Sequence, residues 1–117
     1  MQEGPIVKKS LQFSIVIIDY CDLLNERRKF IIANQLLKAA TSIGANVFEA
    51  QHAESRLDFI HKMKIALKEA NETFYWLSLC EKMNDLTVDP GIFSELKEII
   101  SILSRIVITS RKNLNLK

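Results

Sequence analysis

Apolar residues recur three or four positions apart in four long stretches of the chain, a spacing typical of amphipathic α-helices. The stretches cover about residues 10–25, 30–52, 56–84 and 90–112. Strand-like alternation is sustained nowhere, and glycine and proline are scarce, so short loops are expected between helices. The pattern predicts an all-α fold, an up-down-up-down four-helix bundle over residues 10–112, with tails at 1–9 and 113–117.

Two of the expected helices begin at recognisable capping sequences. Ser55 is followed three residues later by Asp58, which is a plausible capping box for the third helix. Asp89 stands directly before Pro90, the pairing of an N-cap residue with a proline in the first helical position. These residues predict where the third and fourth helices start.

The third expected helix carries two apolar stripes. Its core stripe is Ile60, Met63, Leu67, Ala70, Phe74 and Leu77. At about 100° per residue, the opposite side holds a second set that includes the chain's only tryptophan: Ile65, Glu69, Glu72, Trp76 and Leu79. Trp76 either lies over neighbouring side chains or anchors a subunit interface, and we favour the interface.

The second expected helix carries both an apolar flank and a polar row. The flank, which consists of Phe30, Leu37, Gly44 and Phe48, adds to the case for a homo-oligomer. Because Gly44 costs roughly 1 kcal/mol relative to alanine, we expect close packing of another helix there. The polar row is Gln35, Lys38, Ser42, Asn46 and Glu49. It is either a solvated face or a hydrogen-bonded network with Lys62, Glu69 or Glu72 of the third helix.

Composition narrows the class of protein without identifying a function. Of the 117 residues, 48% are hydrophobic and 26% are charged. The hydrophobic fraction is large enough to form the core of one domain. No unbroken apolar run is longer than that of residues 15–18, which is far short of the roughly 20 residues that a membrane-spanning helix needs. The first ten residues do not resemble a secretory signal. We therefore expect no membrane partner and a cytoplasmic location.

Candidate catalytic and metal-binding residues are few. His52 and His61 lie outside any zinc-binding spacing, and Glu49-x-x-His52 occurs only once, whereas a di-iron bundle needs two such pairs. Cys21 and Cys80 lie on apolar helix faces and are expected to be inert core thiols. The sequence predicts no enzyme activity, no metal and no cofactor.

Basic residues cluster at three places: Arg27-Arg28-Lys29, Lys8-Lys9 and Arg111-Lys112. The formal net charge of only +2 is too small to indicate nucleic-acid binding by itself. In a ring of five copies the charge would reach about +10 and could attract phosphates without regard to base sequence. These charges either bind RNA in this way or solvate the loops.

Residues 35–79 closely resemble the family of four-helix-bundle proteins encoded in intervening sequences of bacterial 23S ribosomal RNA genes. The matching motifs are Gln35-Leu36-Leu37, Thr41-Ser42-Ile43-Gly44-Ala45-Asn46, Glu49-Ala50, Asp58-Phe59-Ile60, Lys62, Ile65 to Ala70, Glu72-Thr73 and Tyr75-Trp76-Leu77. The chain departs from the family pattern at Lys38, where arginine is usual, and at Ala39, where serine is usual. Lys38 keeps the charge but lacks the planar fork of arginine.

The resemblance implies a ring-like homo-oligomer, a homopentamer, with no known enzymatic activity. A related group, the accessory proteins of diversity-generating retroelements, implies contact with nucleic acid and a reverse transcriptase. We expect the protein to contact structured RNA, such as ribosomal RNA, through Arg27, Arg28, Lys29 and Lys38. The alternative is a protein-interaction scaffold or accessory subunit, for example one recruiting a reverse transcriptase, without direct nucleic-acid readout.

Overall fold

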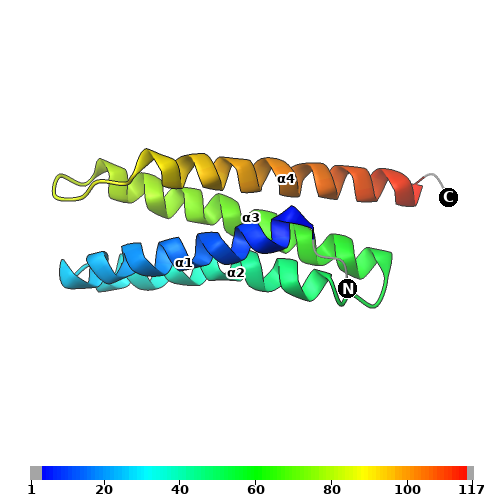
Figure 1. Cartoon of the computed structure of the whole chain (residues 1–117), viewed down its shortest axis with the longest axis horizontal. Coiled ribbons are helices and arrows are strands. Elements are labelled where there is room, and N and C mark those ends of the chain that lie inside the picture. The colour runs from blue at the N-terminus through cyan, green and yellow to red at the C-terminus, as the bar shows by residue number, and fades with distance from the viewer. Residues whose placement is uncertain (1–3, 116–117) are drawn as a thin grey trace.

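Four antiparallel helices run side by side along the long axis of the molecule (Figure 1). The computed structural model describes residues 4–115. The helices are α1 (Pro5–Glu26), α2 (Phe30–Ala50), α3 (Arg56–Lys82) and α4 (Pro90–Asn115). Each packs against the helix before it in the chain, and α4 closes the square against α1. The predicted all-α, up-down-up-down four-helix bundle is confirmed, with extents of 53 × 21 × 21 Å.

The first helix starts earlier than the apolar spacing predicted. Residues 5–9, which were expected in a tail, are helical because Pro5 occupies the first helical position and Ile6 is buried. At the other ends, α2 stops at Ala50, α3 stops at Lys82, and α4 continues three residues beyond the expected end. The remaining parts of the expected tails, residues 1–3 and 116–117, lie outside the described residues.

The helix ends are fixed by local hydrogen bonds. The Ser55 hydroxyl accepts from the backbone N–H of Asp58 at 3.0 Å, and an Asp58 carboxylate oxygen accepts from the backbone N–H of Glu54 at 3.2 Å. The predicted capping box is therefore present, with its return bond shifted by one residue. Asp89 likewise caps α4, because its carboxylate accepts from the backbone N–H of Gly91 at 2.9 Å.

The end of α1 is a Schellman turn built without glycine. The backbone N–H of Lys29 donates to the Leu24 carbonyl at 2.8 Å, and that of Arg28 donates to the Asn25 carbonyl at 3.0 Å. Arg28 has a φ of 64°, in the left-handed region that favours glycine. The turn therefore holds an arginine backbone in a conformation that costs free energy.

The core runs the length of the bundle and is made of mostly aliphatic side chains from all four helices. On α3 the buried positions are Ile60, Met63, Ala66, Ala70, Thr73, Leu77 and Cys80. Leu67 and Phe74, which we expected in the core stripe, are only partly buried, and Phe74 instead packs edge-on against Phe93 of α4 at 5.5 Å. Small residues therefore share the buried side of α3 with larger ones, whereas Leu67 and Phe74 lie at its flanks.

Candidate interaction surfaces

The polar row of α2 lies along the outer seam between α2 and α3. The Lys62 ammonium group forms an ion pair with the Glu49 carboxylate at 2.9 Å, and this hydrogen bond raises the pKa of Lys62. The amide of Asn46 instead donates to the Ser42 carbonyl of its own helix at 2.9 Å. Gln35 and Lys38 are exposed. Of the expected network with α3, the hydrogen bond to Lys62 forms.

The second apolar stripe of α3 faces the same seam. Trp76, Ile65 and Leu79 are partly buried, and the indole packs against the core. The Trp76 indole N–H donates to the Glu72 carboxylate at 3.1 Å, and its ring lies edge-on to Tyr75 at 5.0 Å. The prediction that this stripe lies opposite the core was wrong for Trp76, whose side chain is partly buried against the core. We call the seam formed by the polar row and this stripe the α2–α3 seam.

Two carboxylates lie close together on the α2–α3 seam. Burial and the neighbouring Glu72 carboxylate raise the pKa of Glu69 above its usual value, against smaller opposing effects of Lys68 and Lys38. Glu69 is therefore destabilised when it is charged. A cation from another molecule would relieve that cost.

A larger apolar surface covers the outer side of α1 and α2. Its most exposed members are Leu11 (62% exposed), Ile15 (54%), Phe30 (52%) and Phe48 (52%), with Ile18 beside them. We call these five residues the α1–α2 face. Phe30 and Phe48 belong to the predicted flank, whereas the three residues of α1 were missed. Leu11, Ile15 and Ile18 are spaced four and three residues apart, on a side of the helix outside the core stripe. This spacing could have predicted a second apolar side of α1.

Gly44 lies at the floor of a groove on this surface. A methyl group at Gly44 would stand 3.5 Å from both the Ser10 carbonyl oxygen and the Ser14 hydroxyl, which is ordinary van der Waals contact. The neighbouring helix is therefore present, but it is not close enough to require glycine. The groove has a volume of about 440 Å³ and is lined by Val7, Lys8, Ser10, Leu11, Gly44, Ala45 and Phe48.

The first basic cluster is partly used within the molecule. The Arg27 guanidinium donates to the Asp85 carbonyl, and the Lys29 ammonium group lies 3.5 Å from the Asp85 carboxylate. These contacts join the α1–α2 loop to the α3–α4 loop. Arg28 and Lys38 are exposed, and neither has an ion-pair partner among residues 4–115.

The two cysteines lie in the core near Tyr20. Burial raises the pKa of Cys21 to about 11 and also raises that of Cys80. The Tyr20 hydroxyl donates to the Thr87 carbonyl at 3.2 Å, and burial raises its pKa as well. Both thiols therefore stay protonated at neutral pH, which disfavours nucleophilic chemistry.

Within residues 4–115, no cluster of three His, Cys, Asp or Glu side chains could hold a metal ion. The His52 ring packs against Phe48 at 5.3 Å. None of the described helices is both long and apolar enough to cross a membrane.

The fold and surfaces define an all-α four-helix-bundle protein with a long exposed apolar face. A family model described as 23S rRNA-intervening sequence protein matches residues 2–109, and the chain belongs to this family. A similar solved structure is a protein with unknown function from the S23 ribosomal protein family of Bacteroides thetaiotaomicron VPI-5482. It is 43% identical, with a TM-score of 0.83, over 87% of this chain and 97% of that one. A search of the curated proteins found no match.

Proposed function

We propose that the protein is a non-enzymatic bundle that assembles with copies of itself into a ring and contacts structured RNA in that form. The observation that carries the assembly is the α1–α2 face, where five large apolar side chains are about half exposed. Covering the exposed half of each would contribute roughly 1 kcal/mol. The sum, on the order of 5 kcal/mol, is a substantial share of what association requires.

The relative position of the two surfaces supports a closed ring. A cyclic ring needs two different, complementary surfaces on each subunit. The α1–α2 face and the α2–α3 seam share α2, so they lie on adjacent sides of the bundle, about 90° apart. Their outward normals should differ by roughly 90° in a ring of four and roughly 108° in a ring of five. The arrangement therefore suits a small closed ring of about four or five copies, and the family resemblance is what favours five.

The assembly is tested by measuring particle mass with light scattering. The wild-type chain is expected to have a mass of several copies, and Phe48→Ser on the α1–α2 face is expected to reduce it. Leu57→Ser is a matched control, because Leu57 is also exposed but lies at the start of α3, away from both surfaces. A wild-type particle with the mass of one chain would contradict the proposal.

RNA contact rests on the charge that accumulates in the ring. Arg28 and Lys38 are exposed cations that could reach phosphates, whereas Arg27 and Lys29 are held by Asp85. Contacts of this kind are independent of base sequence and weaken steeply with salt.

The RNA contact is tested by filter binding of ribosomal RNA fragments at two salt concentrations. Binding should fall as salt rises, and it should fall further in the Arg28→Glu, Lys38→Glu double variant. No binding at low salt would leave a protein-interaction scaffold as the function. The engagement of Arg27 and Lys29 with Asp85 favours that second candidate, because it removes two cations from the proposed RNA surface.

A further inference from the structure

Helix α1 begins well short of the end that α3 and α4 reach (Figure 1). The ion pair between Lys9 and Glu98, at 2.9 Å, shows the register of α1 against α4. Since the two helices are antiparallel, Pro5 lies level with about Ile102. From Ile102, α4 continues for about 20 Å to Asn115. Over this length no described helix takes the position beside α4 that α1 occupies elsewhere.

The open position has an apolar floor. Ile102, Ile106 and Thr109 follow Glu98 at intervals of four, eight and eleven residues, so they continue the side of α4 that faces α1. Ile102 and Ile106 are partly buried against the core, and with Arg105 and Ser110 they line a depression of about 360 Å³.

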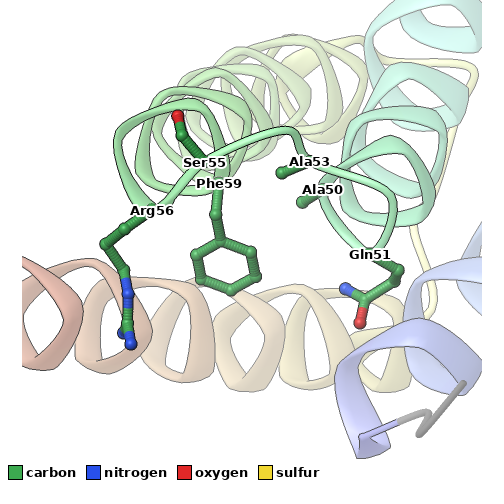
Figure 2. Close-up of a pocket in the computed structure, with 6 residues that line it drawn as sticks. All are labelled: Ala50, Gln51, Ala53, Ser55, Arg56 and Phe59. Atoms are coloured by element: carbon green, nitrogen blue, oxygen red, sulfur yellow. The ribbon is translucent and has the colours of Figure 1, made fainter.

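A second depression adjoins the loop between α2 and α3. Figure 2 shows Phe59 pointing from α3 toward α4, with Gln51 pointing toward α4 from the end of α2. The depression has a volume of about 370 Å³ and is lined by Ala50, Gln51, Ala53, Ser55, Arg56 and Phe59. We call the two depressions together the end groove.

Two arginines, Arg56 and Arg105, line the end groove. Arg56 and Arg105 are exposed, and neither has an ion-pair partner among residues 4–115. After Glu98 the described part of α4 has no acidic residue, but it carries Arg105, Arg111 and Lys112. Two carboxylates, those of Glu54 and Asp58, lie near the start of α3. The Asp58 carboxylate accepts a hydrogen bond from the backbone N–H of Glu54. Glu54 is exposed on the loop.

We propose that the end groove binds an acidic amphipathic helix of a partner protein, which takes the place that α1 leaves empty. A helix fits because the groove continues one position of a four-helix square. About 13 residues span its 20 Å length. The apolar floor would cover the apolar side of that helix, and Arg56 and Arg105 would pair with its acidic flanks. A nucleic-acid backbone has phosphates for the rim but no aliphatic side chains for the floor.

The probe is a fluorescein-labelled synthetic 14-residue helix with leucine along one side and glutamate along its flanks. A matched peptide has lysine in place of every glutamate. Binding is measured by fluorescence anisotropy. The acidic peptide is expected to bind at least tenfold more tightly than the basic one.

Charge reversal of the rim makes the test specific. The Arg56→Glu, Arg105→Glu double variant should weaken binding of the acidic peptide roughly tenfold and strengthen that of the basic peptide. Ile106→Asp should weaken both peptides, and circular dichroism checks that the variant is folded. Lys82→Glu is the matched control, because Lys82 is exposed in the last turn of α3 at the opposite end of the bundle, and it should change neither affinity.

Three results would overturn the proposal. The first is equal affinity for the two peptides, and the second is no binding of either peptide at millimolar concentration. The third is full displacement of the acidic peptide by an RNA oligonucleotide whose own binding survives Ile106→Asp. That third result would identify the rim as a nucleic-acid surface.

Discussion

Replacing Gly44 by alanine should change the stability of the subunit and its assembly in opposite directions. The added methyl group would lie 3.5 Å from the Ser10 carbonyl and the Ser14 hydroxyl, a distance that needs no movement of α1. Glycine in a helix interior lowers stability by about 0.8–1.0 kcal/mol relative to alanine. The same methyl group would stand on the floor of the groove in the α1–α2 face.

The size of the stabilisation follows from these two facts. With no steric penalty to subtract, Gly44→Ala should raise the free energy of unfolding by about 1 kcal/mol. In a domain of this size that gain corresponds to roughly 4 °C in the midpoint of thermal unfolding. The effect on assembly is a loss, because a shallower groove receives less of the neighbouring subunit.

Two measurements separate the effects. Urea unfolding in a Phe48→Ser background, which is expected to be monomeric, measures the subunit alone. Light scattering of Gly44→Ala in the wild-type background measures assembly. A loss of subunit stability of more than about 0.5 kcal/mol would refute the inference that α1 leaves space for the methyl group. An unchanged particle mass would refute a role for the groove.

Three further changes test the surfaces and the turn. Arg28→Gly should raise the unfolding free energy by about 0.5–1 kcal/mol, since it relieves the left-handed backbone, and should weaken RNA binding if Arg28 contacts phosphate. Trp76→Ala should reduce the particle mass in light scattering while leaving the helical circular dichroism largely unchanged; an unchanged mass would exclude Trp76 from the interface. For Glu69, the folded-state pKa lies above the unfolded value, so ionisation costs stability as the pH rises. In the same monomeric background, Glu69→Gln should therefore unfold at a higher temperature than its parent at pH 7. This difference should disappear below about pH 4, and a constant difference across that range would contradict the pKa direction.

The helices and most of the core could be predicted because local chemistry determines them. Phe13, Ile17 and Leu24 are fully buried, and their spacing on one side of α1 was readable from the chain alone. Ser55 and Asp89 form the caps that their positions predicted. In each case the deciding interaction joins residues close in sequence.

The orientation of α3 was harder to predict because residue size and residue polarity conflict there. Because Leu67 and Phe74 have the spacing of a core stripe, the predicted buried side of α3 was centred too close to them. Trp76 was then assigned to the opposite side. In the bundle, Ala66 and Thr73 are fully buried. Thr73 can be buried because its hydroxyl donates to the Glu69 carbonyl of its own helix at 2.8 Å. A hydrophobicity pattern weights Leu67 and Phe74 above such residues, so it rotated the expected core away from the true one.

The surfaces depend on how the helices are aligned along one another and on which charges are paired, and both involve residues far apart in sequence. The Lys9–Glu98 ion pair shows how far α1 reaches along α4. Asp85 binds Arg27 and Lys29, two cations that looked free in the sequence. Because α1 starts at Pro5, it does not cover the end groove, whereas the contacts of Asp85 remove charge from the loop at the other end. Arg27 and Lys29 are thus occupied within the bundle, whereas Arg56 and Arg105 at the end groove are not. A loop lysine or arginine should be assigned to a ligand only after its partners within the bundle are known.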